Sequence, residues 1–384
     1  MKIESITFFA LAYGGAGVGR LADGRVCFVP GVLPGESAEI RIAVEKKRFV
    51  SGEVVRITES SGHRISPVCP LYGKCPGCAY MHCDYETEIS WKERQLKDFL
   101  VRSKLADEAV IKPAFASPER EFYRSKLVLH PGGDGYAGYY AADNETVFPV
   151  EKCFLAGRAI NALLPLKSRE NILLRYTEKD GAGKIEPCSG TVLTEKIPGA
   201  GEFEVAGEGF FQVNLPVAAE LVRQVTSLVE NSGVSEVLEL YCGVGVFSIA
   251  LAEKIPALRC TGIELNKKAI SFAKSNALKH QVAARCRFLA QDAGSGLAKY
   301  RSRSDLLLLL DPPRGGVEKD TLAKIVNLGA KEIIYISCAA DTLARDVKEL
   351  ISAGYRVKSS RVLDMFPNTA HFESLTVLEQ IGHK

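Results

Sequence analysis

From about residue 206 onward, short apolar strands alternate with amphipathic helices, and this alternation limits the possible folds more than any other feature of the chain. The strand segments VLEL, CTGIEL, DLLLLL and EIIYISC are rich in apolar residues, as strands buried on both faces of a parallel sheet are. The segments between them, such as LPVAAELVRQVTSLVENSG, place apolar residues at helical spacing. We predict a doubly wound, Rossmann-like α/β domain over residues 206–384.

Two further parts are expected before this domain. Residues 1–58 contain short strands and Gly-rich turns, and segments such as AEIRIAV alternate at period two. This pattern indicates a small, OB-like β-barrel of a type that often binds oligonucleotides. Residues 59–205 begin with a Pro-, Gly- and Cys-rich connector, continue through a helix at 86–103 with charges on its outer face, and return to strands and turns. We predict a mostly β central domain there.

Length and charge limit the functional classes. The 384 residues suit two or three domains. A net charge of +3 is too small to indicate nucleic-acid binding by itself, so a basic surface for RNA must be local. The segment Lys46–Arg48 is a candidate, and an ordinary solvated strand end is the alternative. No apolar run could cross a bilayer, and the N-terminus lacks a signal-peptide pattern. We expect a cytoplasmic protein with no membrane contact and no obligate protein partner.

A turn with two glycines joins the strand VLEL to a helix and suits a nucleoside ligand. Gly243 and Gly245 allow a tight turn and a close approach of the backbone to a ligand. Glu264 ends the next strand, 21 residues after Gly243, where a carboxylate can accept hydrogen bonds from ribose hydroxyls. Position 248 is Ser instead of the third glycine of a dinucleotide site, which favours S-adenosylmethionine (SAM), a ligand without a pyrophosphate. Asp292 could contact the adenine or simply cap a helix.

Reactive side chains stand at two strand ends further along the chain. Asp311 follows DLLLLL, and the two prolines after it fix its backbone at the edge where such sheets bind ligands. Cys338 ends EIIYISC before a helix, where the helix dipole is expected to lower the thiol pKa. A buried, inert strand cysteine is the alternative. His371 and Glu373 point the same way from one strand, so either could act as a general base.

A cysteine and a base beside a SAM site suit methylation of a pyrimidine carbon. Carbon 5 of uracil is a poor nucleophile, but a thiolate added to carbon 6 converts the ring into an enolate that can accept a methyl group. A base must then remove the carbon 5 proton so that the thiol can leave, which divides one difficult step into easier ones. The chain offers a candidate for each of these parts.

Five motifs resemble, in the same order, those of the RNA uracil-5 methyltransferase family. They are FFQVN (210–214), LYCGVG (240–245), DPPRGG (311–316), SCAADTLARD (337–346) and MFPNTAHFE (365–373). Residues 1–58 resemble the TRAM RNA-binding barrel that many members carry. The resemblance also implies that the helix at 86–103 packs on the catalytic domain despite its position in the sequence. The resemblance implies Cys338 as nucleophile and Glu373 as general base. Around SAM and the target uracil it implies Gln212, Tyr241, Glu264, Asp292 and Asp311. The implied substrate is a uridine in structured RNA, with 23S ribosomal RNA as first choice and transfer RNA as second.

Three positions depart from the family pattern, and two rival functions stay open. The family often has Asn where this chain has Val246, and its usual Ser-Cys-Asn-Pro is here Ser-Cys-Ala-Ala, with Ala339 and Ala340. Methylation of another base position is one rival, although Arg314 stands where amine methyltransferases carry Tyr or Phe. The other rival is a non-catalytic RNA-binding or RNA-chaperone protein.

Four of the eleven cysteines fall within fifteen residues and suggest a metal centre. Cys69, Cys75 and Cys78 form a tight set, with Cys83 or the distant Cys153 as possible fourth ligand. All-sulfur ligation suits zinc or an iron–sulfur cluster, and a structural zinc site usually has two paired elements where this chain has one. Members of the resembled family hold a [4Fe–4S] cluster on this spacing with a distant cysteine before Phe, which implies Cys153.

Overall fold

The apolar strands expected after residue 206 form an eight-stranded sheet in the computed structural model, which describes residues 3–186, 188–300 and 305–381. Five strands run parallel in the order β16-β15-β14-β17-β18. The sheet then continues through β20, antiparallel to both neighbours, to β19 and β6. The strands are β6 (Ile111–Phe115), β14 (Glu236–Leu240), β15 (Arg259–Glu264), β16 (Cys286–Ala290), β17 (Leu306–Leu310), β18 (Glu332–Ser337), β19 (Tyr355–Leu363) and β20 (Glu373–Gln380). The predicted α/β fold is confirmed.

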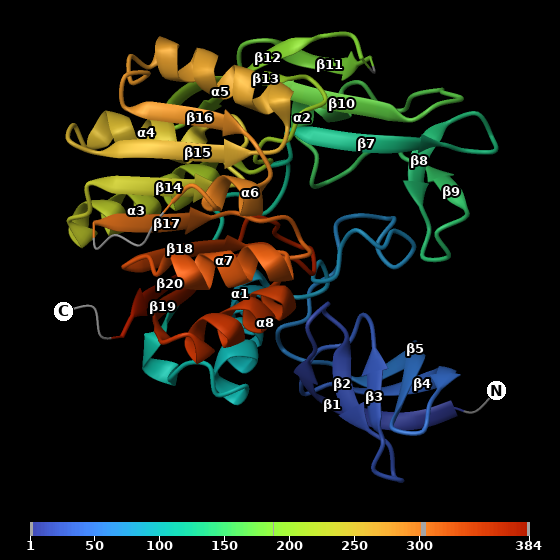
Figure 1. The fold of residues 1–384 in the computed structure, drawn as a ribbon. Coiled ribbons are helices and arrows are strands. Elements are labelled where there is room, and N and C mark those ends of the chain that lie inside the picture. The colour runs from blue at the N-terminus through green and yellow to red at the C-terminus, as the bar shows by residue number, and fades with distance from the viewer. Residues whose placement is uncertain (1–2, 187, 301–304, 382–384) are drawn as a thin grey trace.

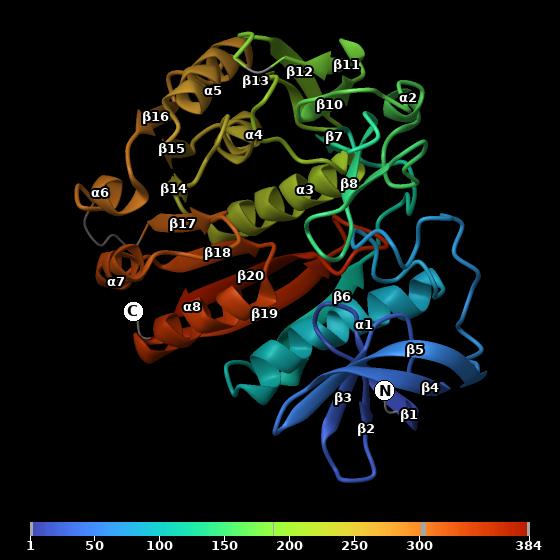
Figure 2. The ribbon, with the colours of Figure 1, turned by 90° about the vertical axis from the view of Figure 1, so that its right-hand side faces the viewer.

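Helices cover both faces of this sheet (Figures 1 and 2). Successive side chains of a strand point to opposite faces, and β17 shows this directly. Leu307 and Leu309 join the buried core under α3, α4 and α5, whereas Leu306, Leu308 and Leu310 join the core under α6, α7 and α8. The helices are α3 (Leu215–Ser232), α4 (Val246–Lys254), α5 (Lys267–Lys279), α6 (Ala293–Leu297), α7 (Lys319–Leu328) and α8 (Ala340–Ser352).

The helix predicted at 86–103 packs on this sheet although it lies far away in sequence. It is observed as α1 (Tyr85–Lys97), continues into the π-helical turn η1 (Asp98–Arg102), and leads through the short helix η2 (Glu108–Val110) into the edge strand β6. Its charged face was predicted to be solvated, and that prediction is wrong for Glu88 and Lys92, which are fully buried. They tolerate burial because they pair with each other and with further polar groups. Across the described residues, no helix combines the length and hydrophobicity that a bilayer crossing requires.

The N-terminal strands close into the predicted barrel. Its strand order is β1-β2-β3-β5-β4, and its interior holds side chains such as Phe8 and Ile40. A Cβ added to Gly17 would meet Val32 within 2.5 Å, and one added to Gly19 would meet Ile6 within 2.5 Å. These two glycines are therefore needed for side-chain packing inside the barrel. The strands are β1 (Ile3–Leu11), β2 (Gly17–Arg20), β3 (Val26–Val29), β4 (Ser37–Glu45) and β5 (Phe49–Glu59).

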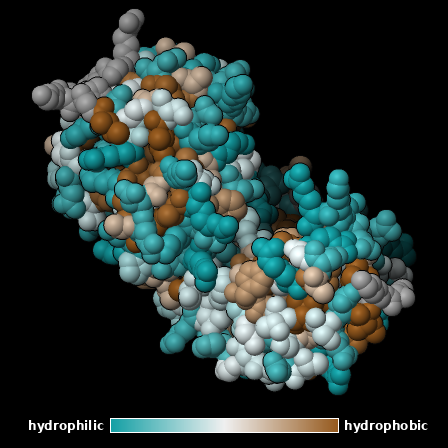
Figure 3. Space-filling view, turned by 90° about the horizontal axis from the view of Figure 1, so that it is seen from below, coloured by the Kyte–Doolittle hydropathy of each residue, from teal (hydrophilic) through white to brown (hydrophobic). Residues whose placement is uncertain are grey.

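The barrel forms a lobe that stands apart from the rest of the molecule (Figure 1). Seen from below, its surface carries apolar patches among polar side chains (Figure 3). Phe9 and Phe49 are among its exposed apolar residues, at 53% and 40% exposure. Phe49 follows the exposed basic segment Lys46–Arg48 between β4 and β5. The barrel therefore presents cations and an aromatic ring together at one strand connection.

The central region supplies a second sheet and a hairpin. The sheet has the order β11-β10-β7-β8-β9, and the β12–β13 hairpin lies against α5, where Asn276 accepts from the Glu204 N–H (2.8 Å) and donates to its carbonyl (3.1 Å). The elements are β7 (Lys126–Pro131), β8 (Ala137–Tyr140), β9 (Val147–Pro149), α2 (Arg158–Asn161), β10 (Ile172–Thr177), β11 (Gly181–Ile185), β12 (Val192–Ile197) and β13 (Gly201–Ala206). The predicted boundary between residues 205 and 206 stays a prediction.

Candidate active site

The loop between β14 and α4 has the backbone geometry that its glycines suggest. Tyr241, Gly243 and Gly245 all have positive φ, at 65°, 52° and 85°. A Cβ at Gly245 would lie 2.8 Å from the ring of Phe288, so only glycine fits there. A Cβ at Gly243 would meet nothing within 4 Å, which means that this part of the loop faces open space. The loop can therefore receive a ligand against its backbone at Gly243.

Two carboxylates flank this loop at the ends of neighbouring strands. Glu264 accepts from the backbone N–H groups of Gly243 (3.4 Å) and Asn266 (2.8 Å). Asp292 is the N-cap of α6 and accepts from the Ser295 N–H (2.9 Å), so its capping role is observed and its contact with a ligand stays a prediction. Tyr241 is half-buried, and burial raises its pKa to about 12. Its phenol therefore stays protonated at neutral pH.

Glu239 has a structural role that the sequence reasoning missed. It is buried and accepts from the backbone N–H of Ser248 (3.0 Å) and from the Ser248 hydroxyl. The serine at the position of a third glycine thus ties the first turn of α4 to β14. Burial raises the pKa of Glu239 to about 8. The sequence contained a sign of this contact: an acid, Glu239, stands four residues before Gly243, and a hydroxyl residue, Ser248, lies in the helix that follows.

Cys338 and Glu373 face each other across two adjacent strands. Ser337 pairs with Ser374 in the antiparallel β18–β20 register, so the residues next to them, Cys338 and Glu373, lie at the same edge of the sheet. Asp311 ends the neighbouring strand β17 at this edge, where its backbone N–H reaches the carbonyl of Leu240 (3.5 Å). Three reactive side chains from distant parts of the chain thus meet beside the glycine loop.

Burial dominates the electrostatics of these groups. The pKa of Cys338 is raised to about 12, mainly by burial and also by the carboxylates of Glu373 and Asp311, whereas Arg314 lowers it. The expectation that the helix dipole lowers this pKa is therefore wrong for the free protein, since the thiol is more than half buried and faces two acids. Burial also raises the pKa of Asp311 to about 7 and that of Glu373 well above its usual value. In the free protein, burial therefore favours the neutral forms of these three groups.

Glu373 and His371, both possible bases from the sequence, differ in their surroundings. His371 accepts a hydrogen bond from Nη2 of Arg314 (2.9 Å to Nδ1), and burial together with Arg314 lowers its pKa to about 4. Glu373 is 5% exposed, and its Oε2 atom has no hydrogen-bond partner within the described residues. An orphaned buried oxygen is costly unless a ligand completes it. This geometry favours Glu373 over His371 as the general base. The observed side-chain contact of His371 is its hydrogen bond with Arg314.

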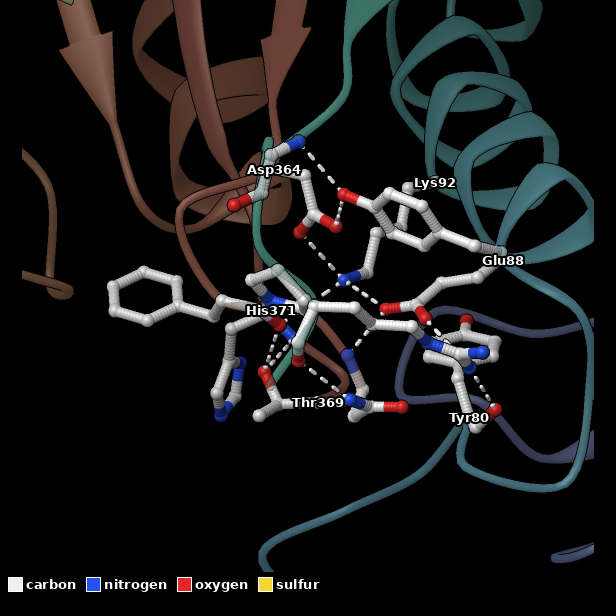
Figure 4. A network of polar contacts seen from close by, with 12 residues as sticks. Tyr80, Glu88, Lys92, Asp364, Thr369 and His371 are labelled. Carbon is white, nitrogen blue, oxygen red and sulfur yellow. Dashed lines mark hydrogen bonds and ion pairs between the residues drawn. The ribbon is translucent and has the colours of Figure 1, made fainter. Parts of the chain in front are cut away.

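A buried polar network fixes the segment that precedes Glu373 (Figure 4). Nζ of Lys92 donates to Glu88 Oε1 (2.7 Å), Asp364 Oδ1 (2.7 Å) and the carbonyl of Phe366 (3.2 Å). Glu88 Oε1 also accepts from the backbone N–H of Asn368 (2.6 Å). α1 therefore holds the loop 364–369, and this contact could not be predicted from the sequence because Lys92 and Asp364 are 272 residues apart.

The motif FFQVN lies just before α3 and connects to the same loop. Asn214 caps α3 and donates to Ser117 Oγ (3.0 Å) and to the carbonyl of Met365 (3.3 Å). Gln212, two residues earlier, is partly exposed. Gln212 thus lies two residues before Asn214, which is buried and hydrogen-bonded to the loop that leads to Glu373.

The predicted metal ligands gather at one place. Cys69, Cys75, Cys78 and Cys153 line a single small cavity, together with apolar and aromatic neighbours such as Tyr139. Cys83 is buried in a different cluster, where its thiol donates to the carbonyl of Tyr80 (3.2 Å). Among the described residues, no group of three or more His, Cys, Asp or Glu side chains meets the arrangement that holds a metal ion. The cavity has the predicted donors, and the ligation itself stays a prediction.

Comparisons with known proteins agree on two parts of the chain. Residues 200–381 match the family model described as tRNA (Uracil-5-)-methyltransferase, and residues 2–55 match the TRAM domain. An RNA methyltransferase of Gloeobacter violaceus is 27% identical, covering 98% of this chain and 96% of its own length. The 23S rRNA (uracil(1939)-C(5))-methyltransferase of Vibrio cholerae is 28% identical, covering 99% and 97%.

A solved structure supports the fold over nearly the whole chain. The tRNA (uracil-54, C5)-methyltransferase of Pyrococcus abyssi, in complex with S-adenosyl-L-homocysteine, superposes with a TM-score of 0.73 at 22% identity. The match covers 97% of this chain and 99% of that chain. Barrel, central region and catalytic sheet therefore occur together in another protein with the same arrangement.

Proposed function

We propose a reaction for this chain on the premise that it belongs to the RNA (uracil-5-)-methyltransferase family, whose members use SAM. The reaction is the transfer of a methyl group to carbon 5 of a uridine in structured RNA. The observation that carries this proposal is the meeting of Cys338 with Glu373 across the β18–β20 register, at the same sheet edge as Asp311. One thiol and one uncompensated buried carboxyl are the two groups that carbon 5 methylation needs.

In the proposed mechanism, the sulfur of Cys338 bonds to carbon 6 of the uracil, and the ring electrons move onto the carbonyl oxygen as an enolate. Carbon 5 would then bond to the methyl group of SAM as the methyl–sulfonium bond breaks, with S-adenosyl-L-homocysteine as the leaving group. Glu373 takes the proton from carbon 5, the ring double bond re-forms, and the carbon–sulfur bond breaks to return the thiolate. Arg314 lowers the pKa of Cys338, so its guanidinium supports the thiolate at the first and last steps.

The SAM site is proposed at the glycine loop, because the open space at Gly243 has the polar surroundings that a nucleoside needs. Glu264 would accept from the ribose hydroxyls, and the adjacent Asp292 would face the adenine. Gly245 keeps the backbone close to Phe288. The remaining predicted residues, Gln212, Tyr241 and Asp311, would line the space between the methyl donor and the uracil.

The four cysteines Cys69, Cys75, Cys78 and Cys153 are proposed to hold a [4Fe–4S] cluster. Their support is the shared cavity with apolar walls and four sulfur donors. When bound, the cluster would cross-link the connector to the central region. Purified protein should be brown and contain about four iron atoms per chain. Cys153→Ser should lose this iron whereas Cys83→Ser should keep it, and stoichiometric zinc without iron would contradict the proposal.

The RNA is proposed to be 23S ribosomal RNA before transfer RNA, since the Vibrio cholerae relative covers nearly the whole chain and its name specifies that RNA. The barrel would contribute to binding through Phe49 and the basic segment Lys46–Arg48, which lie next to each other and are exposed. Aromatic stacking with nearby cations is the usual means of holding single-stranded RNA.

Release of tritium from carbon 5 of labelled uridine tests the reaction. Transcripts of 23S ribosomal RNA and of transfer RNA, each labelled at this carbon, are incubated with SAM and the intact protein. We expect release from the ribosomal transcript, none with Cys338→Ala, and normal release with Cys188→Ala, which alters an exposed cysteine outside the site. Methyl transfer without tritium release would indicate another base position. RNA binding without methyl transfer to either transcript would indicate a non-catalytic protein.

A further inference from the structure

The barrel reaches the catalytic domain through the loop that follows β1. The carbonyl of Ala12 accepts from Nε2 of Gln95 on α1 (2.9 Å). The ring of Tyr13 lies edge-on to Phe99 and Phe372, with centroids 5.1 and 6.0 Å apart. Tyr13 thus packs against the catalytic core from outside the catalytic domain. One of its ring partners, Phe372, directly precedes Glu373.

The hydroxyl of Tyr13 reaches the start of α8. The backbone N–H of Ala340, two residues after Cys338, donates to it (3.2 Å). The first N–H groups of a helix have no partner inside the helix and are usually capped by a polar side chain at the preceding position. That position is Ala339, which forms no side-chain capping bond. The only side chain that the structure places on the Ala340 N–H, within the described part of the chain, comes from the barrel.

The two departures from the family motif account for this arrangement. In Ser-Cys-Asn-Pro, Asn would stand at the N-cap, where its side chain is among the best caps, and Pro would stand at the first helical position with no N–H to satisfy. This chain has Ala at both places, so it lacks the cap and gains a donor. Tyr13, 327 residues away in sequence, supplies an acceptor for this additional donor at the first helical position, whereas an Asn N-cap would accept from the next N–H groups of the first turn.

We propose that Tyr13 is a positioning residue for the nucleophile: its hydroxyl caps α8 across the domain boundary and holds the Cys338–Ala340 turn in register with Glu373. The proposal rests on the proposed role of Cys338. It makes docking of the barrel a condition for an ordered catalytic thiol. Because the ring contacts Phe372 and the hydroxyl binds the Ala340 N–H, one side chain fixes the elements that carry both reactive groups.

A double-mutant cycle between Tyr13→Phe and Ala340→Pro tests this. Tyr13→Phe keeps the ring and removes the acceptor, while Ala340→Pro removes the donor. Proline is compatible with this position because Ala339 is extended (φ −143°, ψ 107°), as a residue before proline must be. Two quantities are measured on the full chain: kcat for methyl transfer, and the rate at which iodoacetamide alkylates Cys338, followed by mass spectrometry of its peptide.

We expect Tyr13→Phe to lower kcat by about fivefold to tenfold, as loss of one buried hydrogen bond would, and to leave the KM for SAM unchanged. The alkylation rate of Cys338 should change as well, because the thiol then samples other orientations. In the Ala340→Pro background, Tyr13→Phe should change neither quantity. Tyr140→Phe, on an exposed ring far from the site in sequence, is the matched control and should behave like the wild type.

Two results would overturn the proposal: an unchanged kcat and alkylation rate in Tyr13→Phe, or an equal loss in the Ala340→Pro background. If Ala340→Pro does not fold, hydrogen exchange of the Ala340 amide replaces it: Tyr13→Phe should speed this exchange and Tyr140→Phe should not, and equal exchange in the two variants would overturn the proposal. A failure of the proposed reaction would give a different result: methyl transfer would persist in the Cys338→Ala variant. The alkylation rates do not depend on that reaction.

Discussion

Replacement of Lys92 by Met should destabilise the protein more than any surface substitution. Met keeps the length of the side chain and removes the charge, so Glu88 and Asp364 lose a partner at 2.7 Å while all three side chains stay buried. Burial lowers the pKa of Lys92, but the carboxylates of Glu88 and Asp364 raise it by more, so the net shift is upward. The ammonium is therefore charged in the native state. Removing one member of a buried, hydrogen-bonded ion pair costs about 3–5 kcal/mol. We expect the free energy of unfolding to fall by that amount.

Urea unfolding followed by tryptophan fluorescence measures this loss at the right place, because the only tryptophan of the chain, Trp91, lies on α1 beside Lys92. Lys196→Met is the matched control. It breaks a pair with Glu178 whose side chains are 53% and 71% exposed, and such pairs contribute about 0–1 kcal/mol. Equal unfolding midpoints for the two variants would refute the idea that the buried network stabilises the loop 364–369.

Three further outcomes follow from the site. The pKa of Glu239 is about 8 in the folded protein, above its value in the unfolded chain, so the folded state binds one more proton between these two values. The free energy of unfolding should therefore fall by about 1.4 kcal/mol per pH unit between roughly pH 5 and pH 8. Glu239→Gln should flatten this slope in urea titrations at several pH values. Gly245→Ala should abolish SAM binding in calorimetry, because its Cβ would meet Phe288 at 2.8 Å with φ at 85°, whereas Gly133→Ala, in open space, should bind normally. Arg314→Met should slow alkylation of Cys338 at pH 8, since the cation lowers that pKa, and an unchanged rate would contradict this.

The parts of the fold that the sequence predicted are those encoded locally. A run such as Leu306–Leu310 is apolar at every position, as is typical of a short strand covered on both faces, and it is fully buried. The glycine loop was readable because positive φ at Gly243 and Gly245 restricts the residue type. Cys338 and Glu373 could be proposed as partners only through the family motifs, because neither residue is unusual by itself.

The features that the sequence did not reveal depend on contacts between distant segments. Lys92 appears as one charge among many on a helix, and its burial follows from Asp364, 272 residues away. The pKa of Cys338 was misjudged because the helix dipole is local and readable, while burial and the neighbouring carboxyls arise only in the assembled site. Likewise, spacing alone left Cys83 and Cys153 as alternatives; the family resemblance implied Cys153, and the tertiary structure places Cys153 in the shared cavity.

The position of β20 has a consequence for how the protein is made. It follows β18 and β19 in the sequence, yet it lies between them in the sheet and pairs with β18 on one side and β19 on the other. Until it is synthesised, both of these strands present open edges, which are the usual starting points of aggregation. It also begins with Glu373, so a nascent or truncated chain lacks the proposed base. Synthesis of β20, closure of the sheet between β18 and β19, and supply of the proposed base would thus coincide.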